Sequence, residues 1–163
     1  PYEARGHGWA PRTLNGAQMK ALTRSEIVTD FHWVTRGSTF DNPWEGVPIR
    51  EVLSRAKPIP EATHVMAVGH LGDQRYGYST NIPLPDLDRD EVLLAMRRNG
   101  EDISNEHGGP MRLVIPHLYT WKSCKWIRGL IFMEADKAGY WEQHGYHMRC
   151  DPFREERFRP ASI

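Results

Sequence analysis

The chain has 163 residues, of which 39% are hydrophobic, and its 21 Lys and Arg are balanced by 21 Asp and Glu. This length suits one domain that buries its own core, and the zero net charge gives no global reason to expect a nucleic-acid partner or a charged membrane surface. No apolar run approaches the ~20 residues that cross a bilayer, so the sequence predicts no membrane span.

The N-terminal third predicts an arm, a short helix and a strand. Residues 1–11 are rich in Gly, Pro and charge and predict an arm outside the core. A helix is expected over 14–22, where apolar residues fall on one face. β-branched and aromatic residues over 27–35 predict a strand, followed by a loop over 37–43 and by a helix that begins near Pro48.

Two hairpins are expected in the middle of the chain. The first turns at Leu71-Gly72-Asp73, and the second turns at Asn99-Gly100, a pair favoured in tight turns. Residues 92–96 fit a helical turn as well as a strand. The strand-like runs of the two hairpins cover residues 64–69, 75–80, 92–98 and 101–103.

Apolar runs over 111–115 and 119–132 predict the last strands. No internal repeat or low-complexity linker divides the chain. We therefore predict one mixed α+β domain dominated by strands over residues 12–158, with a tail over 159–163. The chain begins at Pro1 without a signal-like apolar segment, which says little about its compartment; a cytoplasmic location is the default expectation.

Two segments have the composition of an anion-binding site. In Gly108-Gly109-Pro110-Met111-Arg112, glycines let the backbone approach a ligand, and the arginine can make bidentate contacts to a phosphate or a heterocycle. If the run from Trp121 to Trp126 is a strand, Trp121, Ser123 and Lys125 share a face that suits a flat, phosphate-bearing cofactor. Composition alone favours the alternative, a solvated edge strand whose lysines extend along the surface.

The cysteines and histidines leave a metal site open. Cys124 and Cys150 are too few for a disulfide scaffold, although one bridge between them is possible. His144, His147 and Cys150 are spaced by three residues, and with Cys124 or His117 they would complete a tetrahedral zinc site. This spacing matches no standard zinc signature, so solvent-exposed or hydrogen-bonded histidines are the preferred interpretation.

Five blocks, in one order, resemble the sulfite-oxidase-like family of molybdopterin-binding oxidoreductases. They are Asp30-Phe31-His32-x-Val34-Thr35, Trp44-Glu45-Gly46-Val47-Pro48, Glu106 to Pro116, Tyr119-x-Trp121-Lys122-Ser123-x-Lys125-Trp126-Ile127-Arg128-Gly129, and Gly139-Tyr140-Trp141-Glu142 with Gly145-Tyr146-His147. Collinear blocks are far more specific than any one short motif. The resemblance implies a mixed, mostly β domain that holds molybdenum through a pterin dithiolene.

The resemblance also implies roles for individual residues. Arg36 would lie near the substrate pocket and attract an oxyanion or a sulfoxide oxygen. An active protein would move an oxygen atom to or from a small substrate and exchange electrons with a partner. The residues implied in cofactor binding are His32, His107, Arg112, Ser123 and Lys125, with Cys124 in the same loop.

Trp33 departs from the family's pattern. The family has a cysteine thiolate there as its one protein ligand to molybdenum, whereas an indole N–H donates a proton and has no lone pair to offer. Either normal ligation is lost, or Cys124 or Cys150 substitutes. We favour lost ligation, because a ligand moved to another element needs new groups to orient it.

Two other functions remain open. One is a non-catalytic binding or structural subunit that retains the fold, with Trp33 filling the old metal pocket. The other is a redox-neutral enzyme that uses His32 and His107 as acid–base groups.

Overall fold

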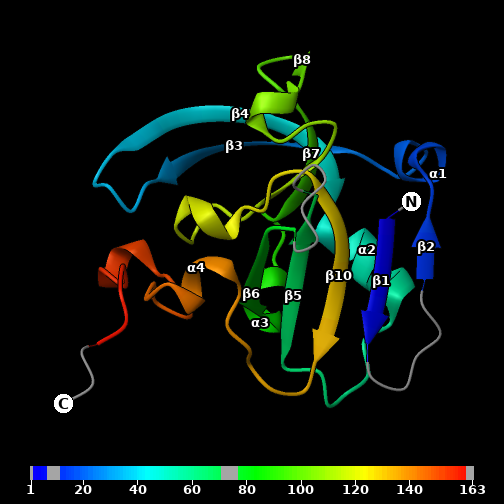
Figure 1. Cartoon of the computed structure of the whole chain (residues 1–163). Helices are drawn as coiled ribbons and strands as arrows, with labels where there is room; N and C mark the ends of the chain where they lie inside the picture. The colour runs from blue at the N-terminus through cyan, green and yellow to red at the C-terminus, as the bar shows by residue number, and fades with distance from the viewer. Residues whose placement is uncertain (1, 7–11, 71–76, 161–163) are drawn as a thin grey trace.

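Two β-sheets form the frame of the computed structural model, which describes residues 2–6, 12–70 and 77–160 (Figure 1). One sheet has the strand order β2-β1-β10-β5-β6, and the other has the order β3-β4-β7-β8, with β9 also paired to β7. The strands are β1 (Tyr2–Gly6), β2 (Arg12–Leu14), β3 (Ser25–His32), β4 (Ser38–Pro48), β5 (His64–Gly69), β6 (Ser79–Pro83), β7 (Leu93–Arg98), β8 (Glu101–Asp102), β9 (Arg112–Val114) and β10 (Ile127–Met133).

The helices of the described residues are short. They are α1 (Gly16–Lys20), α2 (Ile49–Ala56), α3 (Leu84–Leu87) and α4 (Tyr140–Gln143), with 3-10 helices η1 (Asn105–His107), η2 (Thr120–Lys122) and η3 (Pro152–Arg154). None of the helices in this part of the chain is long and apolar enough to cross a membrane. The fold is the mixed, mostly β domain that the sequence predicts.

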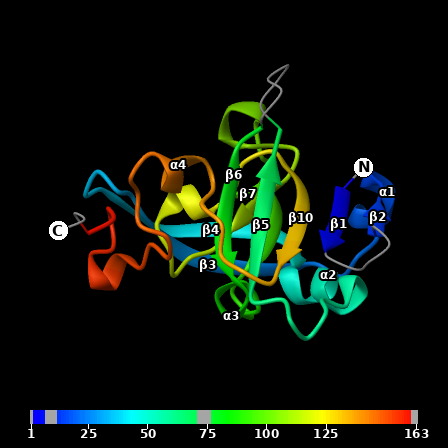
Figure 2. The ribbon, with the colours of Figure 1, turned by 60° about the horizontal axis from the view of Figure 1, so that its bottom comes forward.

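The two sheets pack with their strands crossed. In Figure 2, β3 and β4 run across the strands β5, β6 and β10. Fully buried Val47, Val65 and Leu113 join both sheets in the main apolar cluster. The β3–β4 ribbon continues beyond this core, and in Figure 1 its tip lies on the same side of the molecule as α4 and the C-terminal segment. That junction holds the site described below.

Several predicted elements are confirmed. Strand β5 covers residues 64–69 as expected, and β6 pairs with it. The expected partner strand over 75–80 is only partly confirmed, because β6 begins at Ser79 and runs to Pro83, and the predicted turn over 71–73 lies outside the described residues. The β7–β8 hairpin turns at Asn99 and Gly100, which both have positive φ, as a tight hairpin turn requires. This pairing shows that the segment forms the strand β7, and not the helical turn that residues 92–96 also fit.

Other elements differ from the prediction. Residues Tyr2–Gly6, expected as an arm, form β1 in parallel pairing with β10. The helix expected over 14–22 is shorter because Asn15 and Gln18 form a capping box that starts it at Gly16. The loop expected over 37–43 is the first half of β4. Proline has no N–H for the ladder, but the Pro43 carbonyl accepts a hydrogen bond from the Asn99 N–H at 3.1 Å.

Candidate functional site

Trp33 lies in the tight turn between β3 and β4. Its N–H donates to the carbonyl of Gly37 at 2.9 Å, and its carbonyl accepts the N–H of Arg36, which has a positive φ of 68°. The residue is therefore just past β3 and not within a strand over 27–35. The residue is 42% exposed and borders two cavities.

The first of these, which we call the aromatic cavity, has a volume of about 370 Å³. Indole and phenol rings make up half of its lining, and a guanidinium, an ammonium and hydroxyl groups make up most of the rest. It is lined by Trp33, Val34, Thr35, Tyr78, Arg112, Thr120, Trp121, Ser123, Lys125, Trp126, Trp141 and Tyr146.

Arg112, on β9, is a buried charge without a counter-charge. The residue is 5% exposed, and its guanidinium donates to the carbonyls of His107 at 2.9 Å and Ser123 at 3.2 Å. Its Nε has no partner, and no carboxylate of the described residues forms an ion pair with it. Burial lowers the pKa of Arg112 to about 10. Because an unpaired buried charge is costly, the cavity favours an anion beside Arg112.

Lys125 and Ser123 add two donors to the same wall. The Lys125 ammonium lies 3.0 Å from the carbonyl of Glu106 and 5.5 Å from the ring centre of Trp126. Burial, reinforced by the charge of Arg112, lowers the pKa of Lys125. The Ser123 hydroxyl accepts the N–H of Ile115 at 3.0 Å, so its own proton remains free to donate. With Arg112, these groups give the aromatic cavity a cationic wall beside its aromatic rings.

The two glycines before this arginine serve chain packing. Gly108 has a φ of 101°, and a Cβ there would lie 2.7 Å from the Cβ and Cγ of Lys125. A Cβ on Gly109 would lie 1.9 Å from the carbonyl oxygen of Ile103. The glycines therefore let the loop lie directly against Lys125 and Ile103, whereas the sequence predicted a close approach to a ligand.

A buried ion pair supports the aromatic walls. The Lys122 ammonium and the Glu142 carboxylate are 2.7 Å apart, and both side chains are fully buried. The carboxylate also accepts the indole N–H of Trp121 and the hydroxyl of Thr80, each at 3.1 Å. Lys122 donates further to the Asn81 side chain and to two carbonyls. This network ties η2 to α4 and β6, and it holds Trp121 in place.

The sequence analysis did not foresee this pair. Of the one or two strands expected over 119–132, the later part is confirmed as β10, whereas residues 120–122 form the 3-10 helix η2 and a turn follows before β10 begins. The three residues expected to share a face, Trp121, Ser123 and Lys125, nevertheless all line the aromatic cavity. Both members of the ion pair stand in the quoted family blocks, but nothing in the sequence alone pairs them.

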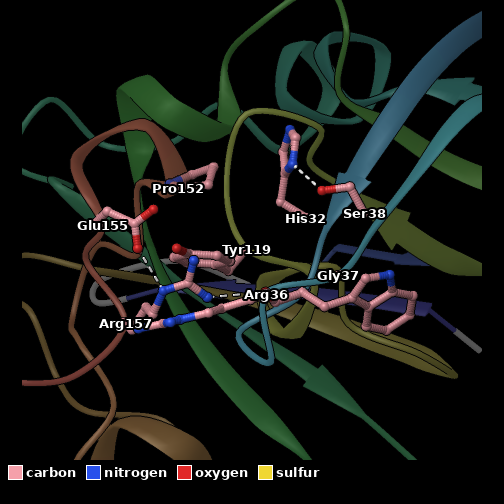
Figure 3. A pocket seen from close by; sticks show the side chains of 9 residues that line it. His32, Arg36, Gly37, Ser38, Tyr119, Pro152, Glu155 and Arg157 are labelled. Atoms are coloured by element: carbon pink, nitrogen blue, oxygen red, sulfur yellow. Dashed lines mark hydrogen bonds and ion pairs between the residues drawn. The ribbon is translucent and has the colours of Figure 1, made fainter.

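The second cavity, which we call the polar cavity, also borders Trp33 and has a volume of about 630 Å³ (Figure 3). It is formed where the β3–β4 turn meets the C-terminal segment. Its lining residues are His32, Trp33, Arg36, Gly37, Ser38, Tyr119, Pro152, Glu155 and Arg157.

Tyr119 lines the polar cavity. The residue is 1% exposed, its hydroxyl has no hydrogen-bond partner among the described residues, and burial raises the pKa of the phenol. One face of its ring stacks on Trp121 at a centroid distance of 5.1 Å and an interplanar angle of 6°. The Arg157 guanidinium lies 5.0 Å from its ring centre. Tyr119 thus links the polar cavity to Trp121, which lines the aromatic cavity.

Arg157 fastens the C-terminal segment to the turn that carries Trp33. Its guanidinium donates to the carbonyls of Trp33 and Val34, the first at 3.2 Å. It also pairs with Glu155 at 2.6 Å, and this hydrogen bond lowers the pKa of Glu155. Nothing in the sequence alone indicates that Arg157 contacts the turn that carries Trp33.

The site residues that the resemblance implies are divided between the cavities. Arg112, Ser123 and Lys125 meet in the aromatic cavity, whereas His32 and Arg36 line the polar cavity. The imidazole of His107 lines neither. It is exposed and lies 2.7 Å from the hydroxyl of Ser104, and only the His107 carbonyl contacts Arg112.

Both cysteines are free, fully buried and absent from the lining of either cavity. Burial raises the pKa of Cys124 to about 12 and also raises that of Cys150. The two sulfurs are therefore protonated thiols at neutral pH. No group of three or more His, Cys, Asp or Glu side chains in the described residues is arranged to hold a metal ion, so the zinc alternative finds no support.

Comparison with known proteins places these features in a family. Residues 7–141 match the model of the oxidoreductase molybdopterin-binding domain. An uncharacterized oxidoreductase of Bacillus subtilis, YuiH, is 43% identical over 148 residues, which are 91% of this chain and 72% of that protein. The mitochondrial sulfite oxidase of Drosophila melanogaster is 27% identical over 135 residues, which are 80% of this chain and 23% of that enzyme.

The fold is also shared with a solved structure. The sulfane dehydrogenase SoxCD from Paracoccus pantotrophus superposes with a TM-score of 0.74 at 21% identity, over 88% of this chain and 40% of that chain. The chain therefore spans most of YuiH but less than half of the other two proteins.

Proposed function

The chain belongs to the family of oxidoreductase molybdopterin-binding domains, and on this premise we propose that its aromatic cavity binds the pterin part of a molybdopterin cofactor. The observation that carries the proposal is the buried, unpaired guanidinium of Arg112 beside Lys125 and Ser123. The cofactor's phosphate would bring the negative charge that this wall lacks, and the aromatic walls suit a flat heterocycle.

Each residue then has a role in binding. Arg112 and Lys125 would pair with the phosphate, and the Ser123 hydroxyl would donate to it or to the pterin. Trp121, held by Glu142 and stacked on Tyr119, would give the heterocycle a rigid flat wall. The same walls would keep water from the bound ring.

The donor set does not fit the metal part of the cofactor. Position 33 presents an indole, and the sulfurs of Cys124 and Cys150 are protonated and line neither cavity. We therefore extend the proposal to lost or altered molybdenum ligation. When bound, the molybdenum centre supplies oxygen-atom transfer to or from a small substrate, with electrons exchanged with a partner. No step of that kind is assigned to this chain's residues.

A second candidate is a non-catalytic binding or structural subunit that works with a partner chain. The observation that favours it is Trp33 itself, because an indole in place of a thiolate removes the family's metal ligand while the fold is retained. The residue is 42% exposed and borders both cavities, so it would act as a wall and not as a buried plug.

The pterin proposal is tested by releasing and oxidising bound pterin from protein made in a molybdopterin-competent host and measuring its fluorescence. Wild-type protein should release pterin, and Lys125→Ala should release much less because a phosphate contact is lost. Arg128→Ala is the matched control: it removes an exposed cation nearby and should release pterin like the wild type. Wild-type protein without pterin, or equal release from Lys125→Ala, would overturn the proposal.

A further inference from the structure

We propose that Arg157 is a positioning residue of the aromatic cavity, through which the C-terminal segment joins two walls of this cavity and slows the release of a bound ligand. One wall is the β3–β4 turn with Trp33 and Val34, and the other includes Tyr146, which follows α4. The two walls come from distant parts of the chain. Residues 155–159, which we call the strap, contact both.

The strap is attached to the Tyr146 wall by backbone pairing and by ring packing. Tyr146 and Phe158 form an isolated antiparallel bridge, and the centroids of their rings lie 5.3 Å apart. Beside this bridge, the N–H of His147 donates to the carbonyl of Arg157 at 3.2 Å. The backbone of Arg157 is therefore fixed to one wall while its side chain is left to reach the other.

The Arg157 side chain makes the second attachment. Its guanidinium donates to the carbonyls of Trp33, at 3.2 Å, and Val34. Within the part of the chain that the structure describes, these are the only hydrogen bonds from another segment to residues 33–35, because the other bonds of Trp33 stay within the turn. The turn is the tip of the β3–β4 ribbon, which continues beyond the main core (Figure 1). Arg157 is thus its main polar attachment to the C-terminal side of the molecule.

A guanidinium suits this position better than an ammonium. Besides the two carbonyls, Arg157 pairs with Glu155 at 2.6 Å, and it lies 5.0 Å from the ring centre of Tyr119, beside which Figure 3 shows it. A planar fork of five donors can make these contacts together, whereas an ammonium is a compact point charge. Because only 16% of the Arg157 side chain is exposed, its hydrogen bonds are partly shielded from water.

The two attachments link the strap to ligand release. While the strap holds, Trp33 and Tyr146 keep a fixed spacing, and a ligand in the aromatic cavity leaves only when that spacing opens. The strap lies beyond residues 7–141, the part of the chain that matches the family model. The identity of the ligand rests on the proposed function, whereas the link between the two walls does not.

Amide hydrogen exchange in full-length protein from a host that makes no molybdopterin tests the link between the walls. In Arg157→Ala, the N–H groups of Trp33 and Arg36, which bond within the turn, should exchange at least about tenfold faster than in wild type. Phe158→Ala loosens the far end of the strap, so it should speed exchange at the same two groups by a smaller factor. Unchanged exchange at Trp33 and Arg36 in Arg157→Ala would overturn the proposal.

Two controls separate this role from a general loss of stability. The matched variant Arg154→Ala removes an arginine whose side chain is 71% exposed on η3 and should leave exchange in the turn unchanged. Arg157→Lys should fall between Arg157→Ala and wild type, because an ammonium makes only part of the contacts. In every variant the amides of β5 should exchange as in wild type. Exchange in β5 that speeds up as much as exchange in the turn would overturn the proposal.

Pterin release tests the effect on the ligand. Protein from a molybdopterin-competent host is diluted, and the pterin still bound is oxidised and measured by fluorescence over time. Arg157→Ala should lose pterin about tenfold faster than wild type, and Arg154→Ala should lose it at the wild-type rate. Equal rates for wild type and Arg157→Ala would overturn the role of the strap alone. Wild-type protein without pterin would contradict the proposed function and retention of this ligand, but not a link between the walls that exchange supports.

Discussion

The two cavities that border Trp33 are built in different ways. The Trp121 wall of the aromatic cavity is held from behind by the fully buried pair of Lys122 and Glu142. The polar cavity is closed by a C-terminal segment whose ion pairs, such as that of Arg157 with Glu155, are partly exposed. Exposed pairs contribute little to stability, whereas a buried pair is costly to break. We infer that the Trp121 wall is a fixed part of the fold, whereas the polar cavity depends on how one segment docks.

The largest expected effect is that of Lys122→Met. This change leaves the Glu142 carboxylate buried and unpaired, so the free energy of unfolding should fall by about 3–5 kcal/mol, measured by urea unfolding. Adding Glu142→Gln should recover part of the loss, because a neutral amide needs no counter-charge. The exposed control Lys137→Met should change little. A loss below about 1 kcal/mol for Lys122→Met would show that the buried pair contributes no more to stability than an exposed one, and would contradict the difference between the two cavities.

A smaller effect is expected at Asp86, which ties the C-terminal segment to α3. Its carboxylate accepts the Arg149 guanidinium at 3.0 Å and lies 3.3 Å from His117. Burial alone would raise the pKa of Asp86, but these two partners outweigh it and lower the pKa below its usual range. Asp86→Asn should therefore cost about 2 kcal/mol of unfolding free energy at neutral pH.

The pH dependence of this cost follows from the lowered pKa. A depressed carboxylate stabilises the fold above its unfolded pKa, about 4, and the contribution disappears as pH falls through the folded pKa. The difference between wild type and Asp86→Asn should thus shrink below about pH 4. The control Asp88→Asn removes an exposed ion pair with Arg50 and should cost no more than about 1 kcal/mol. A cost for Asp86→Asn that grows toward acid pH would contradict this account.

The smallest effect is expected for Tyr119→Phe, which sharpens the contrast from the side of the polar cavity. The removed hydroxyl has no partner in the described residues. The free energy of unfolding, measured by thermal unfolding, should therefore fall by no more than about 0.5 kcal/mol or rise slightly. A clear loss of stability without ligand would show that the hydroxyl has a partner in the protein.

Much of the fold was predictable, and the misses have physical causes. Local patterns were sufficient for β5, for the helix that follows Pro48 and for the Asn99-Gly100 turn. Residues 121–126 alternate like a strand, but the chain forms η2 over residues 120–122. There the buried Lys122 pairs with Glu142, a partner that only the tertiary structure supplies.

The same distinction applies to the site. The collinear blocks were sufficient to group Arg112, Ser123 and Lys125, which the structure brings into one cavity. They were not sufficient to place Arg36 relative to that group, because Arg36 lines the polar cavity and the other three line the aromatic cavity. The role of Arg157 was out of reach, since its contact with the Trp33 carbonyl joins residues 124 positions apart.

The ratio of molybdenum to pterin in purified protein tests the central claim most directly. We expect wild-type protein from a molybdopterin-competent host to contain pterin but far less than an equimolar amount of molybdenum. Trp33→Cys should raise molybdenum toward equimolar, because it restores a thiolate beside the cavity, and Trp33→Phe should not. Wild-type protein with equimolar molybdenum and pterin, or a Trp33→Cys variant with no gain, would contradict the account.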